Sequence, residues 1–263
     1  AEENDEELLE LFFEKGSLSE DEMRQGIKAG MLRHELFPVF CVSALNDMGS
    51  GRLMGFIDNV APAAADLKPE HSVEGETVEP SMEAPTTLFV FKTLQQPNVG
   101  QVNFFKVKSG VVRTNDKLVN ARSGEEETLN QLFIMDGAKR MSVNTLVVGD
   151  IGATLKLKGT ETNDTLHAAS NPVTIRPIAY PQARTLKSVS AEKQHDEEKL
   201  TDALRKIHSQ DPTVTIAYSS ELKQQLLGTQ GELHLDNVHW MLQNIYGLEA
   251  QFEAPKIAYR ETI

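Results

Sequence analysis

Residues 100–112, GQVNFFKVKSGVV, alternate apolar and polar side chains over most of their length. A period of two indicates a β-strand with one packed face and one exposed face. Four more short runs of this kind, separated by Gly, Asn, Asp and Ser turns, lie at 86–94, 116–121, 127–135 and 152–159. In the last run Ala153, Leu155 and Leu157 share one face, and Thr154, Lys156 and Lys158 share the other. The pattern predicts a small antiparallel β-barrel over residues 85–170.

The pattern changes after Asn171 to strand, helix, two strands, helix, strand. We expect strands at 173–180, 213–219, 223–230 and 248–254. The first helix is expected at about 191–209, where Leu200, Leu204 and Ile207 form an apolar stripe. The second helix begins within the stretch 228–237, GTQGELHLDN. This order predicts an α+β, ferredoxin-like domain over residues 171–263.

Residues 1–65 show a third pattern. Helices are expected at 5–16 and from Ser19, which forms a plausible capping box with Glu22. The almost wholly apolar run at 36–43, LFPVFCVS, predicts a strand covered on both faces, and a loop and a helix from Gly51 follow it. A single such strand cannot make a sheet, so this segment is interpreted as the α/β end of a domain whose beginning is absent. Residues 66–84, rich in acids and prolines, have linker composition.

Composition restricts the function. The 263 residues carry a net charge of −13, and residues 1–84 account for all of it, which argues against a protein that coats nucleic acid. The nearly neutral remainder can approach RNA only through local patches. No apolar run is long enough to cross a membrane, and Cys41 is the only cysteine. We expect a soluble, cytoplasmic protein without membrane contact.

The stretch 228–237 contains the candidate chemical pair. Glu232 and His234 are two residues apart, so on a helix they point about 200° away from each other and cannot meet at one substrate atom. A hydrogen-bonded packing role is favoured for His234, and a helix-dipole role for Glu232. Leu233 and Trp240 stack on the opposite side, either packed against another domain or free for a partner. No catalytic motif, metal-ligand cluster or phosphate-binding loop is present in the sequence, so no catalytic or metal residue is assigned.

Three stretches resemble the translation elongation factor G family, and the resemblance covers nearly the whole chain. FPVFCVSALNDMGSG, at 37–51, looks like the last guanine-recognition loop of the family's GTPase domain. VGQVNFFKVKSGVVRTNDKL with VGDIGATLKLKGTETNDTL looks like its second domain, and GELHLDNVHWML through PKIAYRETI looks like its third. The resemblance implies the end of a GTPase domain at 1–65, a linker at 66–84, a barrel at 85–170 and a third domain at 171–263.

The resemblance also implies a function. The parent protein would couple binding and hydrolysis of GTP to movement of tRNA and mRNA on the ribosome, with Ser43, Ala44 and Leu45 in the loop that holds the guanine. This chain alone is not expected to bind GTP, to act as an enzyme or to oligomerise. Small-subunit RNA and protein are the expected partners, with phosphate contacts at Lys106, Lys108, Lys156 and Lys158. Two alternatives stay open: a ribosomal-protection or GTPase-impaired paralogue, and a non-catalytic acidic adaptor that uses the Leu233 and Trp240 face.

Overall fold

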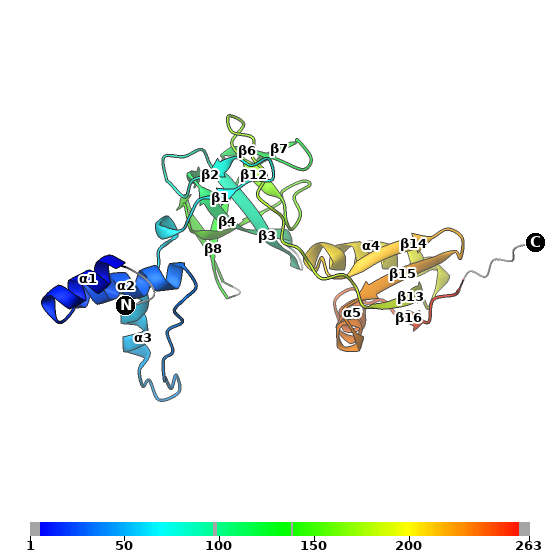
Figure 1. The fold of residues 1–263 in the computed structure, drawn as a ribbon. Helices are drawn as coiled ribbons and strands as arrows, with labels where there is room; N and C mark the ends of the chain where they lie inside the picture. Colours follow the sequence, from blue (N-terminus) through cyan, green and yellow to red (C-terminus); the bar gives the residue numbers. More distant parts are fainter. Residues whose placement is uncertain (1–5, 97–98, 138, 258–263) are drawn as a thin grey trace, which may run out of the picture. The chain divides into compact units, whose positions relative to one another are not determined.

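A computed structural model describes residues 6–96, 99–137 and 139–257. The chain divides into two compact units. Unit 1 contains Ala1–Glu70 and Glu79–Ser81, and unit 2 contains His71–Val78 and Met82–Ile263. Figure 1 shows helices in the first unit, and a curled sheet followed by a helix-covered sheet in the second.

The helices of unit 1 are α1 (Glu6–Lys15), α2 (Glu20–Leu32), α3 (Ser50–Asn59) and the short 3₁₀ helix η1 (Ala64–Asp66). Helix α2 begins with the predicted capping box. The Ser19 hydroxyl accepts from the Glu22 N–H at 3.3 Å, and the Glu22 carboxylate accepts from the Ser19 N–H at 2.7 Å. The N–H groups of Ser19 and Glu22 are thus both hydrogen-bonded, which confirms the predicted capping box.

The same Glu22 carboxylate should titrate far below a normal glutamate. Its bond to the Lys15 ammonium, 2.9 Å long, and then its bonds to Ser19 lower its pKa from 4.5 to about 2. A lowered acid pKa stabilises the fold above the unfolded value of 4.5, and that stabilisation is lost as pH falls towards 2. We predict that Lys15→Met raises the pKa of Glu22 towards 4.5, measured by carboxyl ¹³C NMR. Lys68→Met is the control, and an unchanged Glu22 titration in Lys15→Met would contradict the assignment.

The strand predicted at 36–43 does not form. Residues 37–42 belong to no sheet, and Ser43 makes only an isolated bridge to Met48. The expected burial is also wrong, because Phe37 is 75% and Val39 90% exposed. A strand exists through main-chain hydrogen bonds to its neighbours, and no described residue supplies such a neighbour here. The apolar sequence is therefore irregular and largely exposed, although the Phe40 ring packs against Phe56.

The barrel predicted from the period of two is confirmed. Its main sheet has eight antiparallel strands in the order β7-β6-β12-β3-β4-β11-β8-β9, and β10 pairs with β5 beside it. One core, which includes Leu88, Phe105, Val107 and Leu166, is drawn from most of these strands. The bounds are β3 (Thr87–Gln96), β4 (Gly100–Ser109), β5 (Val111–Arg113), β6 (Lys117–Asn120), β7 (Glu126–Thr128), β8 (Leu132–Asp136), β9 (Lys139–Val143), β10 (Thr145–Val147), β11 (Ile151–Leu155) and β12 (Thr165–His167).

Two of the predicted strands end earlier than expected. The run 100–112 is split at Gly110, whose φ is +75° and where a Cβ would lie 2.7 Å from the Ala84 carbonyl oxygen. The run 152–159 ends at Leu155, because Lys156 adopts a φ of +62° that no strand uses. Thr154 is buried rather than exposed, and its hydroxyl donates to the Gln131 carbonyl. Lys156 and Lys158 thus belong to a loop.

The third domain has the predicted βαββαβ order, with strands in the sheet order β14-β15-β13-β16. Leu200, Leu204 and Ile207 are buried as the apolar stripe predicted. The bounds are β13 (Thr185–Ala191), η2 (Gln194–Asp196), α4 (Glu197–Gln210), β14 (Thr215–Ser219), β15 (Gln224–Thr229), α5 (Glu232–Asn244) and β16 (Ala250–Glu253). Helix α4 therefore starts later than predicted, after β13 and η2.

The first strand of this domain was predicted too early, at 173–180. Pro177 removes a main-chain donor from that segment, which makes only an isolated bridge from Ile175 to Ser72. Val173 and Ile175 instead pack with Val78 and Phe89 of the barrel. Val78 comes from residues 66–84, which contain the short paired strands β1 (Glu70–His71) and β2 (Thr77–Val78).

Candidate functional site

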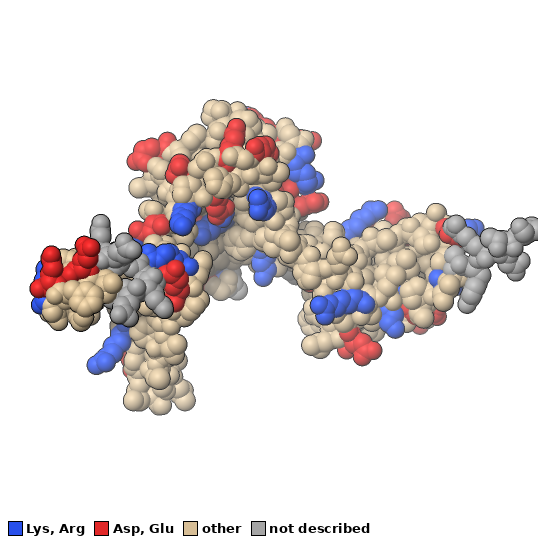
Figure 2. Space-filling model, viewed as in Figure 1, with Lys and Arg blue, Asp and Glu red and all other residues tan. Residues whose placement is uncertain are grey.

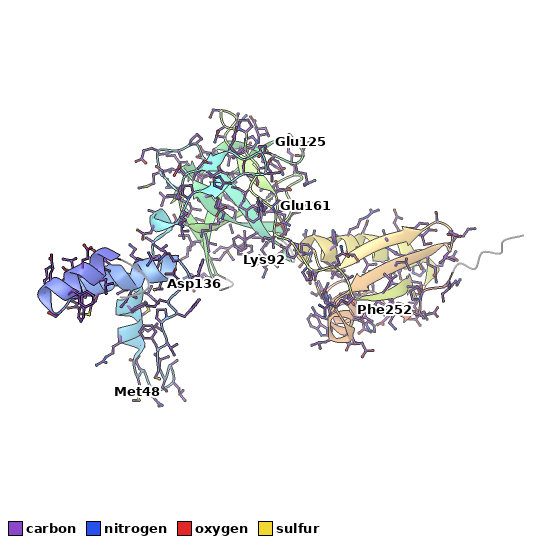
Figure 3. All side chains as sticks on the ribbon, in the orientation of Figure 1. Met48, Lys92, Glu125, Asp136, Glu161 and Phe252 are labelled. Atoms are coloured by element: carbon purple, nitrogen blue, oxygen red, sulfur yellow. The ribbon has the colours of Figure 1, made fainter. Side chains whose placement is uncertain are left out.

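Residues 43–50 of unit 1 form a closed loop that leads into α3. The Ser43 N–H donates to the Met48 carbonyl at 2.9 Å, and the Met48 N–H donates to the Ser43 carbonyl at 3.0 Å. Inside this pair of bonds, the Asp47 N–H donates to the Ala44 carbonyl at 3.3 Å. Met48 marks the end of the loop beside α3 (Figure 3). The loop is therefore held by main-chain bonds at its base and by a turn at its tip.

Gly49 is needed at the base of this loop. Its φ is +80°, in the left-handed region. A Cβ there would lie 3.0 Å from the Cys41 carbonyl oxygen and 3.2 Å from a methyl group of Val42. Any other residue would therefore force the loop away from the segment that precedes it.

The tip of the loop presents main-chain donors. Within the part of the chain that the structure describes, the N–H groups of Ala44, Leu45 and Asn46 donate to no main-chain acceptor, and the Leu45 side chain is 95% exposed. Successive uncommitted N–H groups in a turn bind an acceptor such as a carbonyl oxygen or an anion. The sequence-predicted residues Ser43, Ala44 and Leu45 thus lie together on one exposed loop.

Two side chains that the sequence analysis did not single out help to hold the loop. The Asn46 amide nitrogen donates to the Ser43 hydroxyl at 3.1 Å, and the Ser50 hydroxyl donates to the Asp47 carboxylate. Asp47 has a φ of +48°, a conformation that Asp and Asn adopt more readily than most residues. The signal was available in the sequence as the Asn-Asp pair before Gly49.

The hydrogen bonds of His234 go to Gln230 and Asp211. His234 is mostly buried: its Nδ1 accepts from the Gln230 N–H at 3.1 Å, and its Nε2 lies 3.1 Å from a carboxylate oxygen of Asp211. Because Nδ1 is an acceptor, the proton lies on Nε2 and donates to Asp211. The predicted packing role of His234 is confirmed. Glu232 is exposed in the first turn of α5.

The lysines predicted to contact phosphate fall into two groups. Lys106 and Lys108 point from the same side of β4, and the Lys108 ammonium lies 5.9 Å from the centre of the Phe89 ring. Lys156 and Lys158 are exposed in the loop after β11. Figure 2 shows Lys and Arg side chains dispersed among Asp and Glu over the barrel in this view.

Leu233 and Trp240 are the exposed apolar residues of α5, at 85% and 55% exposure. Among the residues described, no group of three or more His, Cys, Asp and Glu side chains is placed to hold a metal. A search of the same residues finds no helix with the length and apolar character needed to span a bilayer.

Two family models match the chain in consecutive segments. Residues 85–169 match the model described as Elongation factor G domain 2, and residues 180–254 match Elongation Factor G, domain III. The crystal structure of ttk003000868, a protein from Thermus thermophilus, is similar, with a TM-score of 0.80 at 25% sequence identity.

That match covers 96% of this chain but only 36% of the Thermus chain. The YRETI stretch at 259–263, which contributed to the sequence resemblance, lies outside the described residues. The two family matches together span more than half of the 263 residues, in the order of the domains they describe. The chain therefore belongs to the elongation factor G family, of which it carries the second and third domains.

Proposed function

We propose that this chain is the central part of a ribosomal translocation factor, in which a longer protein couples binding and hydrolysis of GTP to movement of tRNA and mRNA. The observation that carries the proposal is the succession of the two family domains in one chain, at 85–169 and 180–254. In this function the barrel and third domain transmit the nucleotide state as rigid bodies. We propose the boundaries 1–65, 66–84, 85–170 and 171–263 for the four segments.

The exposed run at 36–43 supports a GTPase-domain origin for unit 1. Phe37 and Val39 expose most of their surface, and the main chain beside them joins no described sheet. A contiguous apolar run with unpaired main chain is what a central strand of a parallel sheet presents when its neighbours are not in place. The remainder of a GTPase domain would supply those neighbours.

The loop at 43–50 supports GTP as the ligand of the longer protein. The Ala44 N–H is placed at the exposed tip, where it can donate to the guanine carbonyl, with Ser43 and Leu45 on either side. The loop holds one edge of a base and no phosphate group. We therefore predict that the 263-residue chain shows no saturable GTP binding in a fluorescence titration, while the longer protein binds. Saturable binding by the chain alone would contradict this prediction.

The proposed partners are RNA and protein of the small ribosomal subunit. We propose that the protein binds them as a monomer in the cytoplasm. Lys106 and Lys108 share one side of β4, which allows both to approach one phosphate backbone. Cosedimentation of the longer protein with ribosomes in the presence of a GTP analogue tests this proposal. Pelleting that is independent of nucleotide would favour the ribosomal-protection or GTPase-impaired alternative.

The lysine contribution is tested by the same assay at several salt concentrations. The logarithm of the affinity falls as the logarithm of the salt concentration rises. Each phosphate contact that is lost reduces the magnitude of this slope by roughly 0.7–0.9. We predict that the double variant Lys106→Ala, Lys108→Ala has a shallower slope than the wild-type protein. Lys199→Ala is the control, because Lys199 lies on α4 of the third domain and not on β4. Equal slopes for the two variants would show that β4 does not contact ribosomal phosphate groups.

The exposure of Leu233 and Trp240 favours a second candidate, an acidic adaptor that binds another protein through α5. In this function Trp240→Ala abolishes capture of a protein partner and leaves the circular dichroism spectrum unchanged. Ribosome pelleting separates the two functions. Nucleotide-dependent pelleting that persists in Trp240→Ala would exclude the adaptor role of this face.

A further inference from the structure

We infer that Asn46 is a positioning residue for the guanine-binding loop, and that it sets the direction in which the Ser43 hydroxyl donates. This inference rests on the proposed function of the loop. It starts from one contact, the bond of 3.1 Å from the Asn46 amide nitrogen to the Ser43 hydroxyl oxygen. Neither residue of this pair is in a regular element, so the bond joins the base of the loop to its tip.

The bond determines what the hydroxyl can do. A serine hydroxyl has one donor and two acceptor sites. The amide of Asn46 occupies an acceptor site, so the hydroxyl proton stays available to donate outward. The outward donor then lies beside the Ala44 and Leu45 N–H groups, which also lack a main-chain acceptor among the described residues. These donors match a guanine carbonyl and disfavour the amino group that adenine carries at the same place.

The rest of the loop keeps Asn46 in reach of Ser43. The paired bonds between Ser43 and Met48 bring the two ends together, at 2.9 and 3.0 Å. The Asp47 carboxylate accepts from the Ser50 hydroxyl and ties the tip to the first residue of α3. Asn46 therefore adds a side-chain bond across a loop whose backbone already returns on itself.

Two substitutions separate this role from a merely structural one. Asn46→Ala removes the bond, so we expect faster exchange of the Ser43 and Met48 amides and about tenfold weaker guanine nucleotide binding. Asn46→Asp replaces the donor with an acceptor, so the Ser43 hydroxyl turns inward to donate to the carboxylate. The loop then stays closed, but the outward donor is lost and a negative charge faces the base. We expect near-native amide exchange and at least about tenfold weaker binding.

Amide exchange is measured by NMR on the 263-residue chain, and binding of a fluorescent GDP analogue is measured on the longer protein. Asn59→Ala is the control, because the Asn59 amide bonds the Gly55 carbonyl at 2.7 Å in the same unit without touching the loop. Unchanged Ser43 and Met48 exchange in Asn46→Ala overturns the inference, as does wild-type binding by Asn46→Asp.

Failure of the proposed function has a different signature. If the wild-type longer protein binds no guanine nucleotide, the proposed function fails. Amide exchange in the chain still decides whether Asn46 positions Ser43. Faster exchange of the Ser43 and Met48 amides in Asn46→Ala but not in Asn46→Asp would then support the positioning role. Equal exchange in the wild-type chain and both variants would overturn it.

Discussion

Replacing Asp164 with alanine is expected to destabilise the barrel by about 3 kcal/mol. This carboxylate is buried and accepts two bonds from the Arg122 guanidinium, at 2.7 and 2.9 Å. It also accepts from the Asn120 amide and the Glu161 N–H, both at 2.8 Å. Removing it leaves several donors without an acceptor, and each buried unpaired group costs free energy.

The same network explains why the effect should spread through the loop before β12. The Arg122 guanidinium also donates to the Gly159 carbonyl at 2.6 Å, and its bond with Asp164 raises the pKa of Arg122 further above its usual value. Glu127 accepts from the Gly159 N–H and the Thr160 hydroxyl, both at 3.0 Å. The loop between β11 and β12 is thus fastened from outside by Glu127 of β7 and by Arg122, and Asp164 of the same loop pairs with Arg122.

Hydrogen exchange of barrel peptides in increasing urea measures this prediction, because the only tryptophan, Trp240, reports on the third domain. Lys117→Ala is the matched control. Its ion pair with Glu126 is 2.7 Å long, but both side chains are more than half exposed, and such pairs contribute about 0–1 kcal/mol. The barrels of Asp164→Ala and Lys117→Ala should differ in their free energy of unfolding. If the two values agreed within about 0.5 kcal/mol, the scatter of surface substitutions, the network around Asp164 would not stabilise the barrel.

Much of the fold followed from periodicity, and its errors have local causes. The alternation around Phe105 correctly indicated a strand, and the stripe with Leu204 correctly indicated a helix. The segment 173–180 alternates as well, but Pro177 lacks a main-chain donor and only Ile175 forms a bridge there. The less apolar TLKSVSA at 185–191 forms the strand instead. Hydrophobic pattern records burial, whereas a strand also needs main-chain partners, which a single sequence does not reveal.

The candidate site was less predictable than the fold. The assignment of Ser43, Ala44 and Leu45 came from the family resemblance, and it stays a prediction. The bond from Asn46 to Ser43 depends on a turn that closes the loop, which spacing alone does not determine. The contact between Arg122 and Asp164 joins residues that are 42 positions apart, and neither residue type marked it in the sequence.

The second large effect concerns Gly228, in the central strand β15. Gly228 is opposite both Leu186 of β13 and Thr215 of β14. A Cβ at this position would collide with the Thr215 hydroxyl and lie 2.7 Å from the Ala183 Cβ. We expect Gly228→Ala to destabilise the third domain by about 2 kcal/mol, the scale of overpacking in a well-packed region. Urea unfolding followed by Trp240 fluorescence and circular dichroism measures the change.

Gly231, three residues later, separates steric collision from a general cost of replacing glycine. Its φ of 164° is extended backbone that alanine also adopts, and a Cβ there has no atom within 4 Å. Its position before α5 makes alanine only modestly unfavourable, by about 0.5–1 kcal/mol, because alanine is a poor N-cap. Gly228→Ala should therefore be the more damaging of the two. If Gly231→Ala were as damaging, the close approach of β14 and residue 183 to Gly228 would not be what requires glycine. The constraint would then lie in the turn that starts α5.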